Sequence, residues 1–182
     1  MTKGKSPSGI SLPFSKRARP WVVYVALFLA IFGLLDYGYY LTRGTMVERL
    51  LIDSLTVRPA ASLINLLFPS LSAHASGHSL ISSFGQINVL QGCEGTEGMF
   101  LLIAAVIPFP TGRLRRLLGI AGGVLLMYAL NQLRLLALVV SLEGHRGWFA
   151  SLHGLIAPTF IVVGGCLFFF AWAHAATTPS RA

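Results

Sequence analysis

The sequence predicts an all-α membrane protein with about four transmembrane helices, one interfacial or partly inserted helix and a small extracytoplasmic β-hairpin. Of the 182 residues, 54% are hydrophobic and only 11% are charged, against roughly 25% charged in soluble proteins. Several apolar runs reach about 20 residues, enough to cross roughly 30 Å of hydrocarbon. With only two cysteines, the chain is not a disulfide-rich secreted domain, and the composition also excludes a soluble enzyme and a disordered chain.

The first predicted transmembrane helix covers residues 21–41. A cleavable signal peptide would also be apolar, but it would end in small residues at a cleavage site. This run contains Asp36 and ends in Tyr37, Tyr39 and Tyr40, and aromatic residues are typical of a membrane interface. We therefore expect an uncleaved signal anchor.

Three further transmembrane helices are predicted at 94–109, 117–142 and 149–175, each bounded by Gly, Pro or charged residues. The run 94–109 is short, and Pro108 and Pro110 end it. Together with the first helix, these runs predict a single polytopic membrane domain over 21–175, preceded by a disordered basic N-terminus at 1–20 and followed by a short tail at 176–182.

The segment 46–69 is predicted to be a helix on the membrane surface or only partly inserted. Its apolar residues recur at near-helical spacing, but Glu48, Arg49, Asp53 and Arg58 interrupt it. A charge at mid-span costs about 2.5 to 3.5 kcal/mol on insertion scales, which disfavours a full span. The following segment, 73–92, contains apolar residues on both sides of a turn at 84–86, and this pattern predicts the hairpin.

Charge counting supports four spans with both ends in the cytoplasm, because basic residues accumulate on that side of a membrane. Nine of the fourteen basic residues then lie in predicted cytoplasmic segments: Lys3, Lys5, Lys16, Arg17, Arg19, Arg113, Arg115, Arg116 and Arg181. Membrane topology explains the net charge of +8, so we expect the lipid bilayer as a partner and no nucleic acid.

Three chemically active residues are predicted to share one depth at the periplasmic face. Cys93 begins the second span, Arg134 lies about 10 Å below the outer end of the third, and His153 lies about one turn inside the fourth. A thiolate can attack a carbonyl, an imidazole can transfer protons, and a fixed cation can stabilise an oxyanion. We predict Cys93, Arg134 and His153 as catalytic residues.

Each of these residues also has a structural interpretation. Cys93 could be a small buried side chain, His153 an interfacial histidine, and Arg134 a partner of Glu97 that only holds two helices together. Glu94 and Glu97 would oppose thiolate formation unless a cation offsets their charge.

An ionisable residue inside a span nevertheless favours function. Asn131 shares a helical face with Arg134 because it lies three residues earlier. We assign Asn131, Glu97 and Glu94 to substrate binding. His74 and His78 lack an evident third ligand, so we expect neither a metal nor a cofactor.

These features resemble the exosortase/archaeosortase family of membrane transpeptidases. The features occur in a fixed order over roughly 46–175: the run Gly92-Cys93-Glu94-Gly95-Thr96-Glu97, an apolar span ending in Phe109-Pro110, a basic turn, Asn131 with Arg134, and His153. The length is similar to that of the short, exosortase H-like branch. Many relatives carry Cys-Ser-Gly, whereas Glu94 follows the cysteine here.

The resemblance implies that Cys93 is the nucleophile, with Arg134 and His153 as its partners. It further implies a membrane-anchored protein substrate whose C-terminal sorting signal combines a short motif, a transmembrane helix and a basic tail, as in PEP-CTERM proteins. Cleavage near the motif would be followed by transfer to an envelope acceptor, one linked to exopolysaccharide in many relatives. The alternative is a non-enzymatic assembly or transport subunit with a structural pair of Arg134 and Glu97.

Overall fold

A computed structural model describes residues 19–144 and 146–178, and most of them are helical. Along the chain the elements are α1 (Arg19–Tyr40), α2 (Met46–Arg49), the π-helix η1 (Leu50–Val57), α3 (Arg58–Leu67), the 3-10 helix η2 (Pro69–Leu71), β1 (His74–Ser76), β2 (Ser79–Ser82), β3 (Gly85–Asn88), α4 (Thr96–Val106), α5 (Arg113–Gly144), α6 (Arg146–Ser151), the π-helix η3 (Leu152–Ile156) and α7 (Ala157–Thr177). The predicted disorder of 1–18 and the tail at 179–182 lie outside the described residues, whereas Arg19 and Pro20 begin α1.

Within the described residues, four helices are long and apolar enough to cross a membrane: Trp21–Tyr40, Met46–Leu67, Arg113–Leu142 and Gly147–Thr177. They are compatible with the predicted multi-pass membrane protein. The set differs from the predicted one, since α4 is only 11 residues long and the helix from α2 to α3 reaches spanning length. Helix α4 starts two residues after the predicted position because Gly95, its N-cap, adopts φ +90°, a left-handed conformation.

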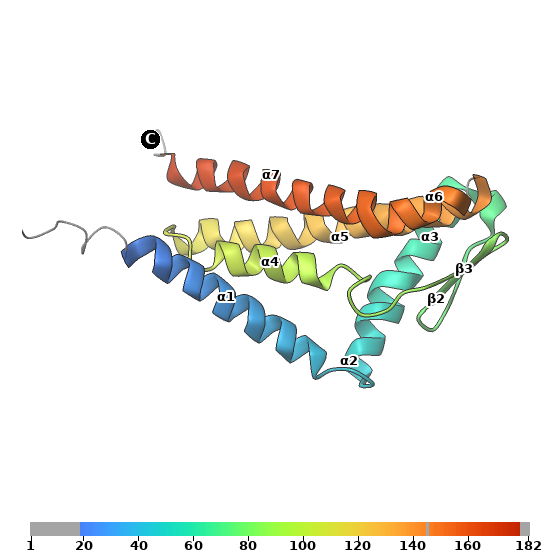
Figure 1. Cartoon of the computed structure of the whole chain (residues 1–182), viewed down its shortest axis with the longest axis horizontal. Helices are drawn as coiled ribbons and strands as arrows, with labels where there is room; N and C mark the ends of the chain where they lie inside the picture. Colours follow the sequence, from blue (N-terminus) through green and yellow to red (C-terminus); the bar gives the residue numbers. More distant parts are fainter. Residues whose placement is uncertain (1–18, 145, 179–182) are drawn as a thin grey trace, which may run out of the picture.

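The long helices are arranged in two directions. Helices α4, α5 and α7 run alongside one another and α1 lies obliquely beside α4, whereas the continuous helix from α2 to α3 crosses one end of this bundle next to the strands (Figure 1). We call this end the sheet end. The opposite end, where α5 begins with Arg113, Arg115 and Arg116, is the basic end.

The crossing helix begins at a capped N-terminus. The Thr45 hydroxyl accepts a hydrogen bond from the Val47 backbone N–H at 3.3 Å, and the Glu48 carboxylate accepts one from the Gly44 N–H at 2.6 Å. The first bond satisfies a backbone donor that a helix start leaves without a partner, and the second satisfies a donor of the preceding turn. This cap ends the turn after α1 and fixes the direction in which the chain crosses the bundle.

The strands form one antiparallel sheet in the order β1-β2-β3. The predicted hairpin corresponds to β2 and β3, in which Leu80 pairs with Ile87. The additional strand β1 pairs His74 with Ile81 and was not predicted, because a strand of three residues with one apolar side chain has no detectable alternation.

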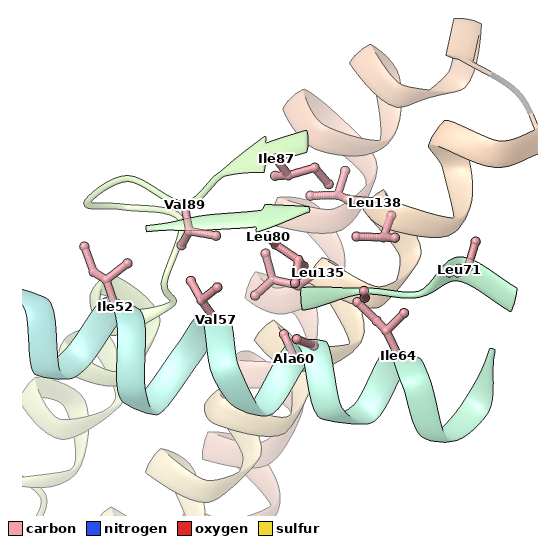
Figure 2. Packing of buried hydrophobic residues seen from close by; sticks show 13 residues of the cluster. Ile52, Val57, Ala60, Ile64, Leu71, Leu80, Ile87, Val89, Leu135 and Leu138 are labelled. Atoms are coloured by element: carbon pink, nitrogen blue, oxygen red, sulfur yellow. The ribbon is translucent and has the colours of Figure 1, made fainter. Parts of the chain in front are cut away.

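One hydrophobic core joins the sheet to the crossing helix and to the last turns of α5. Side chains from η1, α3, β2, β3 and α5 meet there, as Figure 2 shows. Fully buried members include Ile52, Ile64, Leu80 and Leu138. The sheet end of α5 therefore packs against protein on several sides, although the sequence predicts one continuous span over 117–142.

Helices α5 and α7 pack antiparallel through glycines. A Cβ added to Gly119 would lie 2.4 Å from the Trp172 ring, and one added to Gly164 would lie 2.8 Å from Leu130. At the basic end the Trp172 indole N–H donates to the Arg115 carbonyl at 3.0 Å. These contacts fix the register of the two helices, which determines how deep Arg134 and His153 lie.

Candidate functional site

Cys93 lies in the turn between β3 and α4 rather than at the first residue of a helix. Its backbone N–H donates to the Leu90 carbonyl at 2.9 Å, and α4 begins three residues later, at Thr96. The side chain is half-buried and packs against the core of the sheet end. Cys93 therefore does not begin the helix as predicted, because the left-handed Gly95 cap lies between Cys93 and α4.

The turn that carries Cys93 docks against α5 at Asn131. A Cβ on Gly95 would lie 2.8 Å from Asn131 Cγ, closer than real Cβ contacts, so only glycine allows this approach. Asn131 is 1% exposed, and neither its Oδ1 nor its Nδ2 has a hydrogen-bond partner among the described residues. A buried amide without partners costs about 1–3 kcal/mol, and such a group is available to a bound molecule.

The register of α4 on α5 gives the level of Arg134. Gly98 faces Met127 just as Gly95 faces Asn131, so the two helices run antiparallel. Arg134 is three residues beyond Asn131 in the direction of Cys93. Arg134 and the turn of Cys93 therefore lie within about one helical turn of each other along the axis of α5.

The start of α7 lies at the same position along the bundle as Arg134. Arg134 and Ala157 line one cavity of about 200 Å³ between α5 and α7, and His153 precedes Ala157 by one turn. His153 lies in the π-helix η3, a rare geometry that occurs often at functional sites. The Phe149 ring stacks on its imidazole with centroids 5.8 Å apart, and His153 Nδ1 is buried without a hydrogen-bond partner.

The three predicted catalytic side chains are near one another along the bundle but are not directly bonded. Across the described residues, no hydrogen bond or ion pair joins the Cys93 thiol, the Arg134 guanidinium and the His153 imidazole. Arg134 Nε has no hydrogen-bond partner. Glu97 and Arg134 are close enough to interact electrostatically, but within the described part of the chain the two side chains form no ion pair.

Glu94 is buried beside Cys93. It is 2% exposed, and its Oε1 accepts a hydrogen bond from the Thr96 hydroxyl at 2.6 Å. The Tyr39 hydroxyl of α1 lies close to this carboxylate. Tyr39 was not predicted as a site residue, because an aromatic residue near a helix end is typical of any membrane interface.

His78 belongs to a different group. Its Nδ1 lies 2.6 Å from Asp53 Oδ1 of η1, so this histidine links the sheet to the crossing helix. His74 is exposed at the start of β1. Among the described residues, no group of three or more His, Cys, Asp or Glu side chains could hold a metal.

The candidate site and the basic end are separated by about the thickness of a membrane. Eighteen residues of α5 separate Arg113 from Asn131, and 21 separate it from Arg134. At the helical rise these separations are about 27 and 31 Å, close to the roughly 30 Å thickness of a bilayer hydrocarbon core. In a membrane, Arg134 and the basic turn would lie near opposite interfaces.

Comparison with known proteins gave no relative. A scan against protein-family models and searches of characterised proteins and of solved structures found no match to this chain. The site is therefore interpreted from its own geometry and chemistry.

Proposed function

We propose that this protein is a membrane-embedded cysteine peptidase and transpeptidase of the exosortase type. It would cleave the C-terminal sorting signals of exported, membrane-anchored proteins at the periplasmic face of the bacterial cytoplasmic membrane. The product would then be transferred to an envelope acceptor, such as one linked to exopolysaccharide.

The observation that most supports this proposal is the common level of three elements. The turn of Cys93, the Arg134 region of α5 and the start of the η3 and α7 helix meet at the sheet end. This level is about one bilayer thickness from the basic turn. A cleavage motif just outside the membrane, attached to a transmembrane helix, would reach this level.

In the proposed reaction His153 acts first as base and then as acid, while Cys93 is the nucleophile and Arg134 binds the oxyanion. Neutral His153 takes the proton of the Cys93 thiol, and the thiolate attacks the scissile carbonyl while Arg134 donates hydrogen bonds to the oxyanion. The C–N bond then breaks, and imidazolium His153 gives its proton to the leaving amine. In the second half-reaction the acceptor nucleophile attacks the thioester carbonyl while neutral His153 accepts its proton. The C–S bond then breaks, and the Cys93 thiolate takes the proton back from His153.

An apolar groove supports the choice of a membrane-anchored substrate. It has a volume of about 340 Å³ and lies among α1, α4, α5 and α7, with Phe28, Gly98 and Phe170 in its lining. Gly98 is five residues beyond Cys93, so the groove starts just below the turn of the nucleophile. The transmembrane helix of the substrate would occupy this groove, and its motif would then extend toward Cys93.

Cysteine variants test this function. The substrate to use is a co-encoded protein with a C-terminal motif, an apolar helix and an Arg-rich tail, and its processing is followed by gel shift and mass spectrometry. Cys93→Ala and Cys93→Ser should abolish processing while the protein still accumulates in the membrane. Cys166→Ala removes the other thiol, which lies thirteen residues beyond His153 and lines the apolar groove, so this variant should still cleave the substrate. Ser62→Ala, at an exposed position of α3, is the control outside both the groove and the turn of Cys93. Processing by Cys93→Ala would contradict the proposal and favour a non-enzymatic subunit.

A further inference from the structure

An apolar cavity lies beside the basic end, between the first half of α1, the end of α4 and α7. It has a volume of about 400 Å³, within the range of roughly 300–1,000 Å³ that is typical of ligand sites, and we call it the basic-end cavity. Its lining is aromatic and apolar and includes Tyr24, Phe28, Pro108, Phe109, Pro110 and Phe169. None of the steps proposed above uses this cavity.

The cavity lies where α4 stops. This helix has 11 residues and ends at Val106, whereas α5 has 32 residues. The chain then turns through 107–112, where Pro108 and Pro110 have no backbone N–H with which to continue the helix. Both prolines line the cavity, so an irregular turn forms one of its walls and the helices α1 and α7 form the others.

Basic residues lie on two of the elements around the cavity. Arg116 Nη2 donates a hydrogen bond to the Phe109 carbonyl at 3.1 Å, so its guanidinium is held against the turn that bounds the cavity. Arg113 is exposed and forms no ion pair with another described residue. On the other side, α1 begins with Arg19, five residues before Tyr24, which is a rise of about 7.5 Å.

No acidic side chain offsets these charges. No Asp or Glu precedes Asp36, lies between Glu97 and Glu143, or follows Glu143, so the parts of the chain around the cavity contain none. Arg115 and Arg116 instead donate to backbone carbonyls. Both of these bonds from Arg116 start at Nη2, and a guanidinium has five N–H donors, so donors remain for an external anion.

The cavity and its basic rim lie at different depths. In a membrane the basic end would lie at the interface, because it is about one hydrocarbon thickness from Arg134. Trp21, which is 62% exposed, and Tyr24 are on α1 near this level, and such aromatic residues are typical of membrane interfaces. The arginines would then lie among lipid headgroups, and the cavity would lie next to them among acyl chains.

The charge of the rim distinguishes between two occupants of the cavity. The groove assigned to the substrate helix continues into the cavity, since Phe28, Ala105 and Phe169 line both. If the substrate helix extended through the cavity, its Arg-rich tail would meet the arginines of the rim, and like charges at an interface are unfavourable. A molecule with an apolar chain and an anionic head is complementary to both parts.

From these observations we propose that the basic-end cavity binds an anionic phospholipid. An acyl chain would occupy the cavity, and the phosphate would accept hydrogen bonds from Arg113 and Arg116, since guanidinium groups bind phosphate through paired donors. Basic pockets between transmembrane helices bind anionic headgroups in this way. A headgroup with a quaternary ammonium would bind less tightly, because the same arginines repel it. This binding does not require peptidase activity.

Native mass spectrometry of the full chain in detergent tests the binding. The probes are phosphatidylglycerol, phosphatidylcholine and glycerol 3-phosphate, which carries a phosphate without acyl chains. We expect phosphatidylglycerol to bind at least fivefold more tightly than phosphatidylcholine, and we expect glycerol 3-phosphate not to displace it at equal concentration. Displacement would show a site for free phosphate and overturn the assignment to a lipid, as would equal affinity for the two phospholipids.

Arginine variants test the contact with the phosphate. Arg113→Gln should weaken the binding of phosphatidylglycerol about fivefold and the double variant with Arg116→Gln about 25-fold, the scale expected for one basic residue each at an anionic membrane. Arg113 forms no ion pair among the described residues, so the single variant should fold even if the double variant does not. Arg49→Gln with Arg58→Gln, at exposed positions of the crossing helix, is the matched control and should bind normally. Unchanged affinity in Arg113→Gln would contradict the proposal.

A second substitution tests the cavity itself. Val25 lines the cavity and is 48% exposed, so Val25→Trp should fill the space for the acyl chain and lower the affinity at least fivefold. Leu29→Trp is the matched control, since Leu29 is exposed four residues later on α1 and lies outside the lining. Equal affinity in the two tryptophan variants would overturn the inference. Binding should persist in Cys93→Ala, so failure of the lipid site and failure of the peptidase function are distinguishable.

Discussion

Arg134 carries its charge close to the apolar part of the bundle without a hydrogen bond on Nε. Its guanidinium is planar and can donate two parallel hydrogen bonds to one oxygen-bearing group, which the point charge of lysine cannot reproduce. We expect Arg134→Lys to lower the rate of processing by about 10²-fold, the scale of losing one oxyanion donor, while the amount of membrane-inserted protein is unchanged.

The rate of product formation at saturating substrate measures this effect. Arg49→Lys is the control, because Arg49 is exposed at the end of α2 and its replacement should leave the rate unaltered. An equal rate in Arg134→Lys would show that the residue contributes charge alone and would remove it from the oxyanion role.

At the scale of single residues, candidate site residues could be predicted from the sequence where polar residues are rare. Arg134, Asn131 and Glu97 are conspicuous because ionisable and amide groups are costly within apolar helices. The contact of Gly95 with Asn131 and the burial of Glu94 and Tyr39 could not be predicted, since they depend on the register and rotation of helices that no short sequence pattern defines.

At the scale of elements, apolar composition predicted the positions of α1, α5 and the helix from Gly147 to Thr177 to within a few residues. It predicted that the run 94–109 is short, but not that α4 has only 11 residues, because the start of α4 is set by a left-handed Gly95 inside a run whose hydropathy continues. The π-helices η1 and η3 were also missed. The apolar residues around them still follow near-helical spacing, so the sequence pattern does not distinguish them from α-helix.

The packing of α5 on α7 gives a prediction about Gly119. An added Cβ would lie 2.4 Å from a Trp172 ring that is held by its hydrogen bond to the Arg115 carbonyl. Because the ring cannot move freely, Gly119→Ala should destabilise the protein by about 1–3 kcal/mol through overpacking. Thermal unfolding in detergent measures the loss.

Gly164→Ala is the matched control for this substitution. The only close neighbour there is the terminal methyl carbon of Leu130, at 2.8 Å, which can turn away. Its unfolding temperature should fall much less than that of Gly119→Ala. Equal effects of the two substitutions would mean that the indole at Trp172 yields as easily as a leucine methyl.

For the whole molecule, the central question is whether the helix from Met46 to Leu67 crosses the membrane. Its length and hydropathy permit a span, but it crosses the end of the other helices (Figure 1) and its buried face packs on the sheet. If it lies on the surface, its two ends face the same side of the membrane. Composition cannot decide this, because the same apolar face can contact lipid or protein.

Single cysteines in a background lacking Cys93 and Cys166 test this topology. Met46→Cys and Gln86→Cys, both at exposed positions, should react with a membrane-impermeant thiol reagent in spheroplasts. Gly112→Cys, in the basic turn, should react only after the membrane is opened. Labelling of Gln86→Cys and Met46→Cys from opposite sides would show that the helix spans the bilayer and would invert the topology of everything that follows.

The unsatisfied amide of Asn131 affects the protein as a whole. Replacement by leucine, which has a similar shape, would remove a buried polar group that costs about 1–3 kcal/mol. We expect Asn131→Leu to raise the unfolding temperature and to lower processing, because stability and activity often trade off at such sites. Under selection for heat tolerance alone, this position should therefore be among the first to change.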